Sequence, residues 1–111
     1  MATSAQRTDL EMAAKLFRGF GDPLRLAILD ELSRGEQRVT DLVSAVGSSQ
    51  GNVSGHLACL KACGLVADRP EARQVFYRIA SDQVVAVLRA AEALLATNGH
   101  QVALCPNYGA R

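Results

Sequence analysis

The sequence predicts a mainly α-helical fold with a small β-hairpin, arranged as a winged helix-turn-helix in the order α-α-α-α-β-β-α. Two observations carry this prediction. The segments 40–46 and 49–63 are amphipathic and are separated by a glycine and a serine, which is the pattern of two helices joined by a tight turn. The next segment, 65–79, holds two stretches of β-forming residues around a proline-containing turn, which is typical of a hairpin.

The composition indicates one small globular domain. The chain has 111 residues, of which 49% are apolar and 21% are charged. It contains no apolar run of about 18 residues, and its N-terminus lacks the basic flank and apolar block of a signal peptide. We therefore expect a cytoplasmic protein with no membrane partner. The net charge of +1 gives little support to nucleic-acid binding, so a DNA surface must come from local placement of basic residues.

The predicted DNA-binding and dimerisation domain spans residues 9–98, between a flexible N-terminus (1–8) and a C-terminal tail (99–111). Its first helix covers 9–18, and its last helix ends near Asn98. Both helices are more apolar than the surface helices of so small a domain need to be. We expect them to pack on each other and on a second copy of the chain, because helix-turn-helix proteins usually read two half-sites as dimers.

Local signals place the helices between these two. Asp22 is predicted to cap a second helix that starts at Pro23 and ends at Gly35. Residues 36–38 are expected to form a polar link, and Thr40 to cap the following helix. The wing is predicted as a short strand, a turn at 69–73 and a second strand.

The helix over 49–63 has a polar first half that suits it to contact DNA. An exposed helix N-terminus offers unpaired N–H groups to phosphate, and Gln and Asn side chains suit the edge of adenine. The residues of this helix that we expect to contact DNA are Ser49, Gln50, Asn52, Ser54 and His56. In the wing, acidic neighbours dilute the charge of Arg69 and Arg78, so Arg73 is the one wing residue predicted to bind the DNA backbone.

The same helix carries Cys59 and Cys63, and the third cysteine, Cys105, lies in the tail. On a helical wheel the two helix cysteines are about 40° apart and point away from the predicted buried stripe. Helix positions i and i+4 have Cβ atoms about 5–6 Å apart. A disulfide needs about 3.8 Å, so the spacing favours a metal chelate. An extended tail can bring Cys105 to the pair in the same protomer or in its partner. Three thiolates favour soft ions, Cd(II) or Pb(II), with Zn(II) as a further candidate.

The chain resembles the ArsR/SmtB family of metal-responsive repressors. The resemblance rests on D-P-L-R-L-A-I-L at 22–29, N-V-S-G-H-L at 52–57, G-L-V at 64–66 and the wing residues 73–77. The segment H-L-A-C-L-K-A-C-G-L-V at 56–66 is similar to the CmtR type of cadmium- and lead-sensing repressors, which have two helix cysteines and one tail cysteine. The resemblance implies a homodimer that binds double-stranded operator DNA. Metal bound by the three cysteines would release it and derepress metal efflux or resistance genes.

The chain also departs from the family pattern. The position of the arsenic-sensing cysteines reads V-T-D-L at 39–42, and the site of the zinc and nickel sensors reads D-Q-V at 82–84, without a histidine. The cysteine trio is therefore the only metal site that the sequence predicts. Gly51 and Gly55 stand where the family has larger residues, and 70–72 lacks the glycine common in the wing turn.

Other functions fit the sequence less well. A thiol redox repressor would use the same cysteines, with Cys105 paired to a helix cysteine. A thiol enzyme would use Cys59 with His56, but no oxyanion-hole loop or substrate pocket is evident, so we predict neither an enzyme nor a small organic substrate. A metal carrier without DNA function would leave the helix-turn-helix and the wing without a use.

Overall fold

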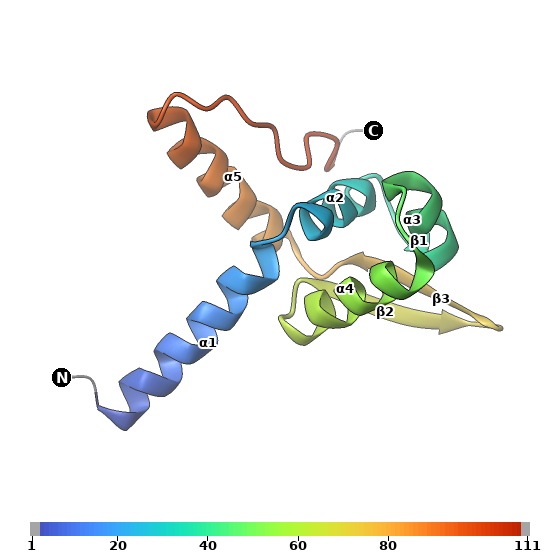
Figure 1. Cartoon of the computed structure of the whole chain (residues 1–111), viewed down its shortest axis with the longest axis horizontal. Coiled ribbons are helices and arrows are strands. Elements are labelled where there is room, and N and C mark those ends of the chain that lie inside the picture. Colours follow the sequence, from blue (N-terminus) through green and yellow to red (C-terminus); the bar gives the residue numbers. More distant parts are fainter. Residues whose placement is uncertain (1–2, 110–111) are drawn as a thin grey trace.

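The computed structural model describes residues 3–109 and has a winged helix-turn-helix fold, as predicted (Figure 1). In chain order the described elements are α1 (Ser4–Phe20), α2 (Pro23–Leu32), β1 (Gln37–Arg38), α3 (Val39–Val46), α4 (Gln50–Ala62), β2 (Val66–Glu71), β3 (Gln74–Ile79) and α5 (Asp82–Thr97). The strands form an antiparallel sheet in the order β1-β3-β2. No helix in 3–109 is long and apolar enough to cross a bilayer. The ends of the predicted terminal segments, 1–2 and 110–111, lie outside the described residues.

The first helix is longer than predicted, because it starts at Ser4 rather than Asp9. Thr3 caps it: its hydroxyl accepts a hydrogen bond from the N–H of Gln6 (3.2 Å), and the Gln6 side chain accepts one from the N–H of Thr3 (2.7 Å). This reciprocal capping box satisfies two N–H groups that a helix start otherwise leaves unpaired. Most of the segment predicted to be flexible is therefore helical.

The region between α2 and α3 differs from the prediction. Asp22 caps α2 as expected, but α2 ends at Leu32 with Ser33 as its C-cap, rather than at Gly35. Part of the expected polar link forms β1, which pairs with β3. Arg38, not Thr40, precedes the first turn of α3. The Asp41 carboxylate fixes this start by accepting hydrogen bonds from the backbone and the guanidinium of Arg38.

The wing is also longer than predicted. Its strands extend to Glu71 and from Gln74, so the expected turn at 69–73 contracts to the two residues between them. Ala72 adopts a φ of 55° in this tight turn. Pro70 pairs with Val75 and so lies inside β2, which is tolerated because β2 is an edge strand of the sheet.

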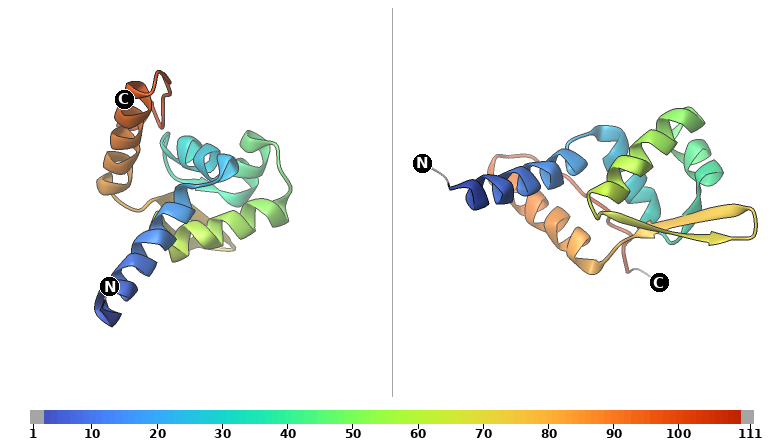
Figure 2. Two further views of the ribbon diagram at one scale, coloured as in Figure 1. Left: turned by 60° about the vertical axis from the view of Figure 1, so that its left-hand side comes forward. Right: turned by 90° about the horizontal axis from the view of Figure 1, so that it is seen from below.

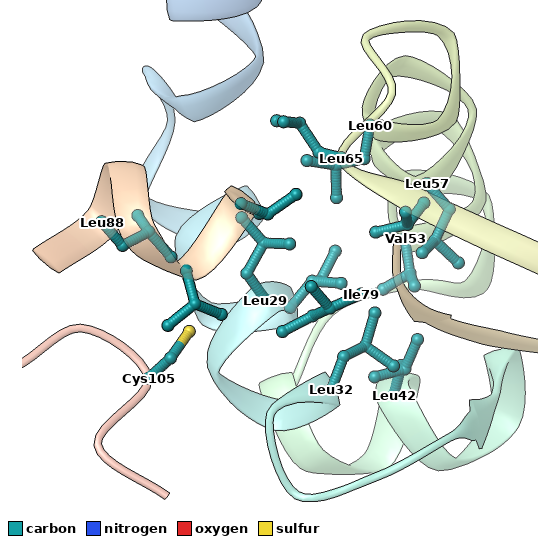
Figure 3. Packing of buried hydrophobic residues seen from close by; sticks show 14 residues of the cluster. Leu29, Leu32, Leu42, Val53, Leu57, Leu60, Leu65, Ile79, Leu88 and Cys105 are labelled. Atoms are coloured by element: carbon teal, nitrogen blue, oxygen red, sulfur yellow. The ribbon is translucent and has the colours of Figure 1, made fainter. Parts of the chain in front are cut away.

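One apolar core fixes α4 against the rest of the body (Figure 3). Val53, Leu57 and Leu60 are the buried face of α4, as the wheel predicted, and pack with residues such as Leu29 and Leu42. Because all five side chains are fully buried, this face sets the rotation of α4. The polar residues at its start therefore point outward.

The two terminal helices project from this body and diverge from one another instead of packing together within the protomer (Figures 1 and 2). Large apolar side chains are exposed on both: Leu10 (63%), Met12 (67%) and Phe17 (66%) on α1, and Leu94 (65%) on α5. After α5 the tail turns back along the helix toward α2 (Figure 1). A single protomer thus leaves apolar faces of α1 and α5 open to solvent.

Candidate DNA interface and cysteine site

The start of α4 presents a preorganised polar surface. The Ser49 hydroxyl accepts a hydrogen bond from the N–H of Asn52 (3.1 Å), and the Asn52 amide donates one to the Ser48 hydroxyl (2.8 Å). Four of the five predicted contact residues of this helix, Ser49, Gln50, Asn52 and Ser54, are exposed. The turn before them is closed by Gly47, whose φ of 68° favours glycine. This end of the helix can therefore enter a groove of DNA with its exposed hydrogen-bonding side chains in front.

Most basic side chains near the wing are already paired with acidic ones. Arg69 binds Glu36 (2.7 Å) and Glu71 (2.6 Å) and lies 4.8 Å from the centre of the Phe76 ring. The hydrogen bond from Arg69 lowers the pKa of Glu36 and keeps that carboxylate charged. Arg73, at the exposed tip, forms no ion pair with any residue in 3–109. Its predicted contact with the DNA backbone stays a prediction, and Arg69 is not available for the same role.

His56, the fifth predicted contact on α4, is placed differently. Its ring is half-buried, and its Nδ1 accepts a hydrogen bond from Arg25 Nε at 3.1 Å. Arg25 also donates, through Nη1, to the carbonyl oxygen of Arg18 at the end of α1 (2.5 Å). No sequence pattern predicts this role of Arg25, although it is the arginine of the D-P-L-R motif.

The Cys63 thiol lies where the end of α4 meets the last turns of α1, next to the Cys59 thiol. Burial, and then the adjacent Cys59 thiol, raise the pKa of Cys63. The Cys63 thiol donates a hydrogen bond to the carbonyl oxygen of Lys15 (3.4 Å). A Cβ atom built on Gly19 would lie only 3.1 Å from Cys63 Sγ, so the two helices approach closely here. The prediction that both thiols point away from the core is wrong for Cys63, because the last turns of α1 cover that face of α4.

Cys105 is buried in the core, with only 2% of its surface exposed, near Leu88 (Figure 3). Burial raises the pKa of its thiol to about 11. The tail around it is anchored to α5. Arg89 donates to the carbonyl oxygens of Leu104 and Cys105, and Glu92 accepts from the N–H of Leu104.

The tail has a second anchor, because the Tyr108 hydroxyl donates to Asp82. No pattern in the tail predicts these anchors, since the tail has no periodicity and its partners lie on α5. The only available signal was the presence of polar residues on an otherwise apolar helix.

The structure does not bring the three cysteines together within one protomer. Across residues 3–109 no three His, Cys, Asp or Glu side chains form a group that could hold a metal ion. Cys105 lies at the opposite end of the core from Leu60 and Leu65, which flank Cys63 in sequence (Figure 3). Cys59 and Cys63 are two soft donors on one helix, and Cys105 is not beside them.

These features define a class of protein. A winged helix-turn-helix whose recognition helix, here α4, exposes a polar start is the fold of a DNA-binding transcriptional regulator.

The particular family follows from comparison with known proteins. Residues 22–68 match the model of the bacterial regulatory protein, arsR family, and the chain belongs to this family. It is 34% identical over 98 residues to a probable mercury resistance operon repressor of Streptomyces lividans, covering 88% of this chain and 78% of that protein. It is 40% identical over 75 residues to the HTH-type transcriptional regulator CmtR of Mycobacterium tuberculosis, covering 68% of this chain and 64% of CmtR.

Solved structures agree with this assignment. NolR from Sinorhizobium fredii superposes with a TM-score of 0.76 at 34% identity, covering 85% of this chain and 94% of that one. The homodimeric winged helix-turn-helix domain of Mb0332 from Mycobacterium bovis superposes with a TM-score of 0.79 at 26% identity, covering 93% of this chain and 95% of that one. The family and the fold are therefore established, and the signal that this regulator senses is a separate question.

Proposed function

We propose that this chain is a cytoplasmic homodimeric repressor that binds operator DNA in its metal-free form. Cd(II) or Pb(II) bound by Cys59, Cys63 and Cys105 releases it and derepresses metal efflux or resistance genes. The observation that carries this proposal is the position of the thiol pair. Cys59 and Cys63 sit on the helix whose other end is predicted to read DNA, and Cys63 is hydrogen-bonded to α1.

Metal binding at this pair would change the contact between α4 and α1. A cysteine binds metal as the thiolate, which has no proton to donate. The hydrogen bond from Cys63 to the Lys15 carbonyl is therefore lost when metal binds, and the carbonyl is left without that donor. Because sensing and reading share one helix, the disturbance reaches the DNA interface directly. Reciprocal coupling between the two ligands is typically about 1–3 kcal/mol.

The third ligand requires the tail to move. Cys105 is buried and anchored by Arg89 and Glu92, so in the docked form it cannot reach the thiol pair. Release of these anchors frees the segment after α5 to deliver Cys105 to its own protomer or to its partner. Three thiolates then complete a soft site that favours Cd(II) and Pb(II), with Zn(II) also accepted.

Dimerisation is supported by the exposed apolar faces. Leu10, Met12 and Phe17 on α1 and Leu94 on α5 are more than half exposed, and a second copy would cover them. The M. bovis neighbour is homodimeric. The name of one relative, a probable mercury resistance operon repressor, supports a metal signal, whereas the nodulation protein NolR is also a relative. The choice of ion thus rests on the cysteines of this chain.

Ultraviolet titration of the metal-free protein with Cd(II) tests the site. The wild-type protein is expected to develop a thiolate-to-metal band that saturates at one Cd(II) per site, and Cys59→Ser and Cys63→Ser to lose most of it. Cys105→Ser is expected to keep a weaker band from two thiolates, with about tenfold or greater loss of affinity. A band of unchanged intensity and affinity in Cys105→Ser would exclude the three-cysteine site. Release of DNA by peroxide but not by metal would instead identify the redox repressor.

A further inference from the structure

Arg25 joins three helices at the base of α1. Its backbone N–H is held by the Asp22 carboxylate that caps α2 (3.1 Å). Its side chain donates to the Arg18 carbonyl at the end of α1 and to His56 Nδ1 on α4. The Arg18 carbonyl also accepts a hydrogen bond from the N–H of Gly21 (3.1 Å), so two donors hold this carbonyl at the link from α1 to α2.

We propose that Arg25 is a positioning residue for DNA binding: by bridging Arg18 and His56 it fixes the angle between α1 and the recognition helix α4. His56 then acts through Arg25 and not by touching DNA. The inference rests on the proposed dimerisation through α1, because only in that dimer does the angle set the distance between the two recognition helices. It does not depend on the metal site.

The chemistry of arginine suits this role. A guanidinium carries five donors in a rigid plane, so two of its edges can bind acceptors on different helices at once. A lysine has the same charge but offers a compact ammonium that cannot span both acceptors. His56 Nδ1 accepts this hydrogen bond through its lone pair, so the pairing is not a salt bridge.

The geometry shows why a small change in this angle matters. Helix α1 has 17 residues and is therefore about 25 Å long. A tilt of about 10° at its base would move its far end by about 4 Å. Paired recognition helices must sit about 34–36 Å apart to enter successive major grooves. A shift of this size in each protomer exceeds the spacing of one base pair, about 3.4 Å, and would put the half-sites out of register.

The contact between α1 and α4 offers few other restraints. Near Arg25 the two helices meet at Gly19, where a Cβ atom would lie 3.1 Å from Cys63, and at the hydrogen bond from Cys63 to Lys15. Both of these involve the cysteine that the proposed metal would take. Apolar side chains of α1 also pack against the core, and Arg25 adds a polar bridge from α1 to α4 that uses no thiol.

A double-mutant cycle tests this proposal with the full-length, metal-free protein. The DNA is a duplex selected in vitro from random sequence by the wild-type protein, together with a duplex that keeps only one of its half-sites. The variants are Arg25→Lys, His56→Leu, their combination, and His56→Asn, whose amide oxygen can replace Nδ1 as an acceptor. Sedimentation and thermal unfolding check that each variant is a folded dimer.

We expect Arg25→Lys and His56→Leu each to weaken binding to the full duplex about tenfold or more, with half-site binding within about threefold of wild type. The double variant should bind the full duplex no more weakly than the weaker-binding single variant, and His56→Asn should bind it like the wild type. An additive loss in the double variant would show that His56 contacts DNA itself and would overturn the proposal. So would equal losses on the half-site and the full duplex, or full affinity in Arg25→Lys. A wild-type protein that sediments as a monomer would instead refute the proposed dimer.

Discussion

Gly19 on α1 and Gly55 on α4 both lie close to the cysteine pair in the chain or in space, but their surroundings differ. A Cβ atom on Gly19 would lie 3.0 Å from a methyl group of Leu65 and 3.1 Å from Cys63 Sγ. One on Gly55 would meet no atom within 4 Å. The close approach of α1 to α4 therefore leaves no room for a side chain at Gly19. At Gly55 a side chain would fit within the protomer, and the glycine only lowers the stability of the helix.

Matched alanine substitutions test this difference. Gly55→Ala should raise the free energy of unfolding by about 0.5–1 kcal/mol, because alanine loses less backbone entropy in a helix. Gly19→Ala should lower it, since overpacking costs about 1–3 kcal/mol and the residue lies near the helix end, where the gain is small. Urea denaturation measures both. A Gly19→Ala variant as stable as Gly55→Ala would show that the contact between α1 and α4 is not tightly packed.

At the scale of elements, the tail and α5 form a docked unit. Arg89 and Glu92 hold the backbone of 104–105, and burial raises the pKa of Cys105 to about 11, so little reactive thiolate forms at neutral pH. The docked tail therefore withholds the third proposed metal ligand.

Alkylation by iodoacetamide measures this docking at each cysteine without metal. In the wild-type protein at pH 8, Cys105 should react more slowly than Cys59, which is less buried. Arg89→Ala should speed the reaction at Cys105 about tenfold by raising the population of the undocked tail, and leave Cys59 unchanged. Gln83→Ala, on the exposed surface of the same helix, is the control. Equal rates at Cys105 in the wild type and Arg89→Ala would mean that Arg89 does not hold the tail.

Local sequence signals predicted those elements that local interactions determine. The cap at Asp22, the stop at Gly47 and the buried stripe of α4 all follow from short patterns, and the structure has them. The strand β1 has only two residues and exists because β3 lies beside it, so no local pattern reveals it. The docking of Cys105 likewise depends on Arg89 and Glu92 on α5, which no short pattern within the tail reveals.

The same reason limits prediction of the site. The wheel identified Cys59 and Cys63 as neighbours, since one helix positions both. It could not show that α1 covers Cys63, because the crossing of α1 and α4 depends on the packing of Gly19. The roles of Arg25 and His56 also depend on contacts between helices and were beyond the reach of the sequence.

At the scale of the whole molecule, the open apolar faces of α1 and α5 predict a dimer. Phe17→Glu places a charge on the face of α1 and should raise the dimer dissociation constant about 30-fold or more, as expected for an aromatic anchor in an interface. Ser44→Glu on the exposed side of α3 should leave it unchanged. Analytical ultracentrifugation measures the dimer dissociation constant of both variants. A Phe17→Glu variant that dimerises as tightly as Ser44→Glu would place the interface elsewhere.

The most direct test of the central claim is the affinity of the protein for its selected operator duplex, measured by fluorescence anisotropy with and without saturating Cd(II). We predict that Cd(II) weakens DNA binding by the wild-type protein by about 5–150-fold, and that Cys59→Ser binds DNA equally well with and without Cd(II). Unchanged DNA affinity in a wild-type protein whose absorption shows bound Cd(II) would contradict a metal-released repressor.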